Sequence, residues 1–258
     1  MPEGDTVYRS AKNLAAVLDG TVLTRCDIRV PKFATVDLTG EVVHEVVSRG
    51  KHLLMRVGEY TLHSHLKMEG SWHIYPDGNR WRRPEWQARA IIANKEFTAV
   101  GFELGLFEIV ERASEESVVG YLGPDLLGPG WDAELAIANL ASDPSREIGL
   151  ALLDQRNLAG LGNVYRCELC FLRGVLPTRP VGDVNDLPRM VALAKKLIEA
   201  NKDRTERTTT GKLRGDTDWV YGRAGRPCLR CGTRISRGEL GDDPLQLRNT
   251  FWCPRCQT

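Results

Sequence analysis

The sequence predicts an α+β multidomain protein with an N-terminal helix, a β-sandwich, a helical part and a C-terminal β-hairpin zinc finger. Short β-rich runs separated by Gly, Pro, Asp and Asn fill most of residues 22–110. Apolar residues at helical spacing follow in 132–201, and two Cys-x2-Cys pairs lie in the last part of the chain. We expect domain boundaries at 1–120, 132–218 and 219–258, with a Gly- and Pro-rich hinge at 121–131.

The composition favours a soluble intracellular protein. The 258 residues are 42% hydrophobic, enough to bury a core, and 27% charged, with no apolar run of membrane-spanning length. The opening residues lack the basic start and apolar run of a secretory signal. We therefore expect a cytoplasmic location, where the seven cysteines do not form a disulfide framework.

The charge is distributed unevenly, although the net charge is only +1. Residues 151–258 hold 19 Lys and Arg against 12 Asp and Glu, or +7, which leaves 16 against 22, or −6, in residues 1–150. A basic half suggests a polyanion partner, and a solvated arginine-rich surface is an equal alternative.

The first part begins with a helix predicted at 5–19. Val7, Ala11, Leu14 and Leu18 recur at helical spacing, Gly20 supplies the stop, and Asp5 or Thr6 would cap the helix. Strands are then predicted at 22–30, 42–49, 52–57, 61–67, 88–94 and 106–110, with an exposed loop at 75–87.

The second part is predicted to be helical. Helices are expected at 132–141, 145–154, 163–173 and 188–201, with Asp132 and Ser145 as N-caps. The polar residues 201–218 are typical of a mobile connector.

The strongest single motif is the pair of knuckles Cys228-x2-Cys231 and Cys253-x2-Cys256. Four thiolates on two tight turns can enclose one tetrahedral Zn²⁺, and a closed Cys₄ site leaves no position for water, so we expect one structural zinc per chain. Four unrelated thiols are a weak alternative, because this segment has too few large apolar residues to fold without a bound metal or a covalent cross-link. The candidate phosphate contacts on this module are Arg230, Arg234, Arg237 and Arg248.

The other cysteines and the histidines favour structural interpretations. Cys167 and Cys170 share one face of a predicted helix and are expected in the core, as is the lone strand cysteine Cys26. Packing or surface positions are expected for His63, His65 and His73.

The N-terminus offers a second chemical candidate. Removal of Met1 would leave Pro2 as a free secondary amine, a nucleophile that condenses with an aldehyde carbon to an iminium, and Glu3 beside it could transfer a proton. Taken alone, Pro2-Glu3 is more often an ordinary chain start.

Six segments, in order along the chain, resemble the formamidopyrimidine-DNA glycosylase and endonuclease VIII family, and the opening resembles the endonuclease VIII branch. They are PEGDTV (2–7), SRGKHL (48–53), HLKMEG (65–70), LDQRNLAGLGNVY (153–165), VYGR (220–223) and RNTFWC (248–253). The resemblance implies a β-sandwich catalytic domain, a helix-two-turn-helix domain and a zinc finger.

The resemblance also implies site residues. Pro2 would attack C1′ of the damaged nucleotide, Glu3 would act as general acid at the sugar, and Lys51 would contact phosphate near the lesion. Asn163 and Arg248 would hold phosphates, and Gly160 and Gly162 permit that close approach. Met68 would fill the gap left by the extruded base, with core packing as an equal alternative.

The Pro-Glu-Gly opening and the short 201–219 connector favour the branch that acts on pyrimidine lesions, since the resemblance implies a longer loop over the flipped base in the purine-lesion branch. Thr6 stands where the formamidopyrimidine branch usually has an acidic residue, so the resemblance implies no role for a second carboxylate near the nucleophile. We therefore expect a monomeric base-excision-repair glycosylase and AP lyase acting on damaged DNA, whether duplex, bubble or single-stranded. The alternatives are a non-catalytic damaged-DNA-binding zinc protein of the same fold and a zinc ribbon that binds RNA or a protein.

Overall fold

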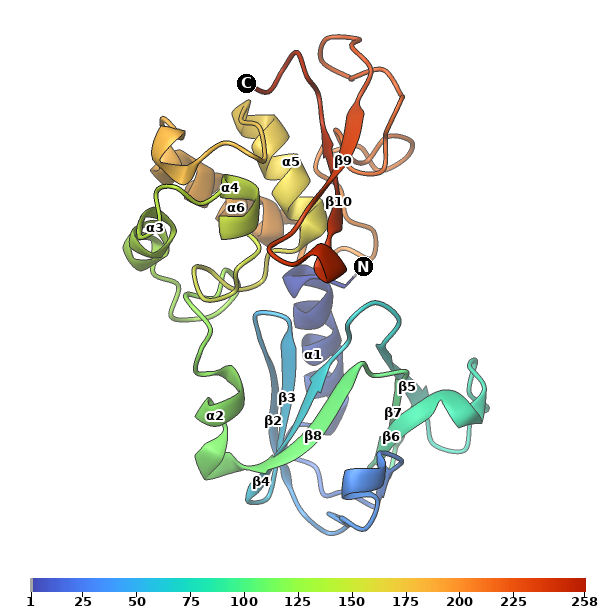
Figure 1. Ribbon diagram of the computed structural model, residues 1–258. Coiled ribbons are helices and arrows are strands. Elements are labelled where there is room, and N and C mark those ends of the chain that lie inside the picture. The colour runs from blue at the N-terminus through green and yellow to red at the C-terminus, as the bar shows by residue number, and fades with distance from the viewer. Residues whose placement is uncertain (1) are drawn as a thin grey trace. The chain divides into compact units, whose positions relative to one another are not determined.

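The computed structural model describes residues 2–258 and divides into two compact units, one running to Tyr121 and the other covering Leu122–Thr258 (Figure 1). Met1, whose removal the sequence predicts, lies outside the described residues. No helix in the described part of the chain has the length and apolar character needed to cross a membrane. The finer division into a hinge and three domains stays a prediction.

Helix α1 (Gly4–Leu18) opens the first unit and buries one face. Val7, Ala11, Leu14 and Leu18 are at most 3% exposed, which is the stripe that the spacing predicts. The predicted caps are wrong, because the N-cap position is Glu3 and no side chain caps the helix. Asp5 lies within the first turn, where its carboxylate accepts the Thr6 N–H at 2.7 Å.

Two four-stranded antiparallel sheets form the predicted β-sandwich. One sheet has the order β1-β6-β7-β5 and the other β2-β3-β4-β8. The strands are β1 (Arg25–Ile28), β2 (Val43–Arg49), β3 (His52–Val57), β4 (Tyr60–His65), β5 (Ser71–Pro76), β6 (Ala88–Ala93), β7 (Phe97–Phe102) and β8 (Leu106–Glu111). Side chains of both sheets and α1 share one core, which includes Leu14, Met55 and Ile92.

Strands β5 and β7 were not predicted from the sequence. β7 is buried on both faces and so lacks the alternation that marks a half-buried strand. β5 carries polar and partly exposed residues along its length, and its end at Pro76 falls inside the predicted loop. The strand expected at 22–30 is shorter, since Val22 forms only an isolated bridge with Val42.

Short helical turns complete the first unit and recur in the second. They are η1 (Pro31–Phe33), η2 (Glu85–Gln87), η3 (Arg112–Ser114), α2 (Glu116–Val119), η4 (Val181–Asp183) and η5 (Pro244–Gln246).

The second unit contains helices α3 (Ala133–Ala141), α4 (Ile148–Ala151), α5 (Asn163–Arg173) and α6 (Leu187–Asn201) around a common apolar core. Asp132 caps α3 as predicted, accepting the Leu135 N–H at 2.9 Å. Ser145 does not cap α4, because its hydroxyl donates to Asp143 and the helix begins after Glu147.

The predicted mobile connector 201–218 is organised by hydrogen bonds. The Asn201 amide accepts the Thr208 N–H at 2.8 Å and donates to the Thr208 carbonyl at 3.0 Å. The chain then forms the hairpin of β9 (Ser236–Leu240) and β10 (Arg248–Trp252), which packs on α5 through Phe171 and Cys167.

Candidate functional site

The N-terminal end of α1 holds Pro2 and Glu3 in different environments. Glu3 is fully buried, and its carbonyl accepts the N–H groups of Thr6 and Val7 at 3.0 and 3.1 Å. Pro2 stands just outside the helix and is half-buried. The helix therefore fixes the backbone next to Pro2, and its positive dipole end favours an anion at this position.

Lys51 lies at the same end of the unit as Glu3. The end of α1 is tied to the beginning of β2, since Gly20 N–H donates to the Val43 carbonyl at 2.7 Å. α1 packs along β2, and its 15 residues span about 22 Å, close to the length of the seven-residue β2. The helix start thus lies near the β2–β3 turn that carries Lys51 (Figure 1).

Met68 lies on a neighbouring turn at this end. His52 pairs with His65 at the ends of β3 and β4, so the Lys51 turn and the Leu66–Gly70 turn adjoin. Met68 is 62% exposed, which rules out the alternative that it packs in the core. Lys67 takes a positive φ of 53°, and a Cβ at Gly70 would come within 2.5 Å of the Leu66 carbonyl oxygen.

A chain of hydrogen bonds runs beneath the Lys51 turn. His63 joins Glu108 at 2.7 Å and His52 at 2.7 Å, and His52 joins the Tyr121 hydroxyl at 3.0 Å. Burial lowers the pKa of His52 to about 3, and His63 adds to this shift. Burial also lowers the pKa of His65 to about 4, followed by the charges of Lys67 and Lys51. Both histidines are therefore neutral at physiological pH.

In the second unit, Asn163 contacts the backbone of the strand that carries Arg248. Asn163 begins α5, and its amide nitrogen donates to the Asn249 carbonyl at 2.8 Å, next to the exposed Arg248. The Asn163 Oδ1 atom is buried without a hydrogen-bond partner among the described residues. An exposed arginine beside a helix N-terminus is a suitable arrangement for a phosphate.

The sequence analysis missed two fully buried charged side chains on α5. Arg166 donates to the Thr250 hydroxyl at 2.6 Å and fastens the helix to β10. The Glu168 carboxylate accepts the N–H groups of Trp219, Val220 and Tyr221 at 2.8 to 2.9 Å. Two isolated charges within a mostly apolar helix were the available signal.

The four knuckle cysteines form the predicted cluster. All four Sγ atoms lie within 4.8 Å of one another, with 4.0 Å between Cys228 and Cys256 and 3.5 Å between Cys231 and Cys253. Zn–S bonds of about 2.3 Å in a tetrahedron require sulfurs about 3.8 Å apart. Burial and the neighbouring thiols raise the pKa of Cys256 to about 12. The thiolate is therefore unfavourable here unless a bound cation compensates its charge. The residues therefore fit a zinc ion.

Two family models cover most of the chain. Residues 1–104 match the formamidopyrimidine-DNA glycosylase N-terminal domain, and residues 122–210 match the formamidopyrimidine-DNA glycosylase H2TH domain. The chain belongs to the formamidopyrimidine-DNA glycosylase family. Family membership confirms the resemblance and the enzyme class, that of DNA glycosylases and AP lyases.

Full-length relatives place the chain with the endonuclease VIII branch of the family. The probable endonuclease 8 2 of Streptomyces coelicolor is 56% identical over all of this chain and 94% of the relative. The DNA-(apurinic or apyrimidinic site) lyase Nei2 of Mycolicibacterium smegmatis is 52% identical over all of this chain and 99% of the relative. A MutM complex with DNA containing carbocyclic 8-oxo-G shares the fold, with a TM-score of 0.81, 21% identity and full coverage of both chains.

Of the four zinc-module arginines expected to contact phosphate, three have intramolecular partners. Arg230 stacks over Phe171 with 4.4 Å to the ring centroid, Arg234 donates to the Gly225 carbonyl at 3.0 Å, and Arg237 donates to Asn249 Oδ1 at 2.9 Å. Arg248 is exposed and remains the strongest phosphate candidate.

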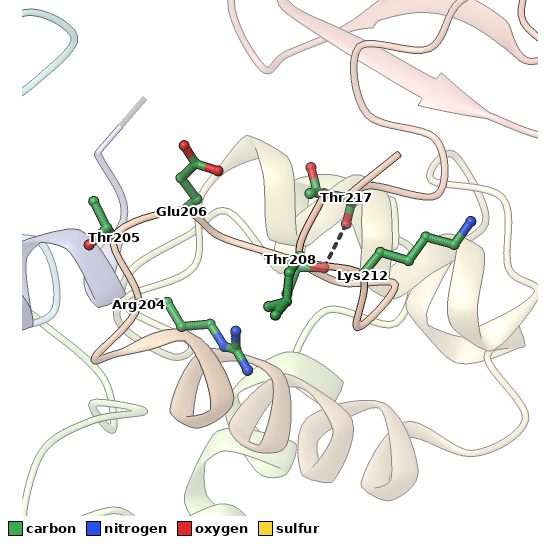
Figure 2. A pocket seen from close by; sticks show the side chains of 7 residues that line it. Arg204, Thr205, Glu206, Thr208, Lys212 and Thr217 are labelled. Carbon is green, nitrogen blue, oxygen red and sulfur yellow. Dashed lines mark hydrogen bonds between the residues drawn. The ribbon is translucent and has the colours of Figure 1, made fainter. Parts of the chain in front are cut away.

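The connector after α6 lines a small pocket of about 280 Å³. Figure 2 shows its side chains, among them Thr208, which donates to the Thr217 carbonyl at 3.2 Å. The lining residues are Arg204, Thr205, Glu206, Thr208, Lys212, Leu213 and Thr217. The packing expected for the other cysteines is confirmed, since Cys167 and Cys170 are fully buried and Cys26 packs against the first core.

Proposed function

We propose that this chain removes oxidised bases, pyrimidines above all, from damaged DNA and then cuts the strand by β- and δ-elimination through an iminium on Pro2. The observation that carries the proposal is the gathering of Pro2, buried Glu3 and the Lys51 turn at one end of the first unit. A nucleophile, a proton donor and a phosphate-binding cation are the groups that this reaction requires.

The first step needs Pro2 to be a free secondary amine, so we propose that Met1 is removed. The Pro2 nitrogen lone pair forms a bond to C1′, and the glycosidic bond breaks with its electron pair leaving on the base, which takes up the proton that the Pro2 nitrogen loses. Glu3 gives a proton to the sugar-ring oxygen, the ring opens, and the nitrogen and C1′ form an iminium. Lys51 holds the phosphate near the lesion while the charge develops.

Strand cleavage follows from the iminium. It acidifies the C2′–H bond, and loss of that proton expels the phosphate on the 3′ side, which is β-elimination. A second loss of a proton expels the phosphate on the 5′ side, and hydrolysis of the iminium returns the free amine of Pro2.

We propose that the second unit holds the DNA backbone. Asn163 with the α5 N-terminus and Arg248 on β10 contact phosphates, and exposed Met68 of the first unit fills the space left by the extruded base. Zinc at Cys228, Cys231, Cys253 and Cys256 would have a structural role, fixing the hairpin that presents Arg248. We expect the protein to act as a monomer in the cytoplasm.

Two observations support pyrimidine lesions as substrates. The 52–56% identical relatives are named as endonuclease 8 2 and Nei2 proteins, and the 201–219 connector is short. Matched oligonucleotides with thymine glycol, 5-hydroxyuracil, uracil or 8-oxoguanine test the proposal. Fastest release of 8-oxoguanine would overturn the pyrimidine preference, and binding without any cleavage of abasic DNA would favour the non-catalytic alternative.

A further inference from the structure

Residues 77–87, between β5 and β6, form a structured platform on the first unit (Figure 1, turquoise). The Trp81 ring lies with its centroid 6.5 Å from Tyr75 and 6.0 Å from Phe102. The Arg82 N–H donates to the Tyr75 hydroxyl at 3.2 Å. These contacts hold the segment against the sheet, so the side chains that it exposes have defined positions.

The platform is joined to the turn that carries Met68. Arg83 donates to the Ser71 hydroxyl at 3.0 Å and approaches the carbonyl of Glu69, the residue after Met68, at 3.5 Å. Arg83 also donates to the Gln87 side chain at 2.9 Å. Trp86 lies directly before Gln87 in η2. Arg83 therefore connects the short helix that carries Trp86 to the turn that carries Met68.

Trp86 is 73% exposed, an unusual position for the largest apolar side chain. Glu85 pairs with Arg29 at 2.9 Å and Glu103 pairs with Arg83, whereas Asp77 accepts the Thr98 hydroxyl and forms no ion pair among residues 2–258. The exposed Arg80, Arg82 and Arg89 form no ion pair within residues 2–258. The unpaired charge of residues 77–89 is therefore mainly positive, with three arginines against Asp77.

The local charge differs from that of the surrounding half of the chain. Residues 77–89 contain four arginines, one aspartate and one glutamate, for a net charge of 4 − 2 = +2, whereas residues 1–150 together carry −6. A positively charged segment that carries an exposed tryptophan complements a polyanion that also offers flat aromatic faces. Single-stranded nucleic acid has both properties, since its phosphates are charged and its bases are unpaired.

We infer that Trp86, Arg80, Arg82 and Arg89 form an accessory surface that binds a single-stranded DNA segment flanking the lesion. The indole stacks on one unpaired base, and the arginines contact the adjoining phosphates. The inference rests on the proposed function, because it extends the DNA site outward from Met68. In a duplex the base faces are covered by their neighbours, so a duplex flank would gain no stacking.

The test compares DNA flanks on an uncleavable abasic-site analogue. The lesion lies in a short core duplex that is blunt, extended by a single-stranded tail, or extended by a duplex tail of equal length. Wild-type protein should bind the single-stranded tail best, and Trp86→Ala should weaken that ligand by about five- to a hundredfold. Its affinity for the blunt duplex should not change.

Charge variants give an independent readout on the same ligands. Arg82→Ala with Arg89→Ala should lower the slope of log affinity against log salt by about 1.4 for the single-stranded tail. Arg112→Ala, at another exposed arginine of the first unit, is the matched control and should leave every affinity unchanged. Because the altered side chains are exposed, thermal unfolding should stay at the wild-type midpoint.

Equal wild-type affinity for the three ligands would overturn the inference, and so would an equal loss on both kinds of tail. An effect of Trp86→Ala seen only with a protein partner would also contradict it. Failure of the proposed function is a separate result, in which wild-type protein cleaves no damaged or abasic DNA at all.

Discussion

The Nδ1 atom of His52 lies 2.7 Å from Nε2 of His63, inside the sheet that carries the Lys51 turn. In the tautomers that pair every ring nitrogen, the Nδ1–H of His63 donates to Glu108, the Nδ1–H of His52 donates to His63, and the Tyr121 hydroxyl donates to His52 Nε2. All ring nitrogens of His52 and His63 then have a hydrogen-bond partner, and a proton added to His52 would disrupt this hydrogen-bond chain.

This hydrogen-bond chain predicts a loss of stability in mild acid. The pKa of His52 is about 3 in the folded protein and near 6.5 when unfolded. The unfolded chain thus binds a proton that the folded chain excludes, and the free energy of unfolding falls as pH falls below 6.5. His52 should contribute about 1.4 kcal/mol per pH unit, and the partly exposed His65 less.

Urea unfolding at pH 6.5, 5.75 and 5.0 measures this slope. His52→Gln should flatten it, whereas His44→Gln, at an exposed histidine, should leave it unchanged. Stability that is constant or rises over this range would contradict the account.

Glu3→Gln should separate the two chemical steps. Loss of the buried carboxyl removes the proton donor to the sugar ring, so base release should fall by about a hundredfold or more. A preformed abasic site already has its aldehyde form, so cleavage there should suffer less. Single-turnover assays on damaged and abasic oligonucleotides measure the two effects, and equal losses would argue against this role of Glu3.

Zinc removal should destabilise the module that carries Arg248. We expect one zinc per chain by metal analysis, and chelation or Cys228→Ala with Cys253→Ala should abolish it together with DNA binding. The helical core around Leu169 lies apart from these cysteines, so most helical circular dichroism should persist. A double variant that still retains zinc would refute the assignment of the ligands.

Arg248→Ala should weaken binding to all DNA ligands about equally, because the exposed side chain is expected to contact a phosphate. It should also lower the slope of log affinity against log salt concentration by about 1. Arg234→Ala, on the same module but bonded to the Gly225 carbonyl, is a matched comparison with a smaller expected effect. A loss confined to one base sequence would point to base contacts instead.

The sequence predicted best where the signal is local. Helix α5 has the predicted bounds, because Gly162 and Gly174 flank a strongly amphipathic segment. The cysteine knuckles were predictable because each pair of ligands lies within four consecutive residues. The strand β7 was missed because burial on both faces removes the periodic signal. Contacts between distant segments could not be predicted, since strand register brings His63 to Glu108 and the packing of α5 on β10 brings Asn163 to Asn249.

The central claim is that the Pro2 nitrogen forms the bond to C1′, and borohydride trapping tests it most directly. Reduction converts the iminium to a stable amine, so protein shown by mass to begin at Pro2 should become covalently joined to abasic DNA, with the adduct on its N-terminal peptide. Protein that retains Met1 has an amide at this nitrogen and should bind DNA without being trapped. Full cleavage by protein that retains Met1, or an adduct mapped to Lys51, would contradict the account.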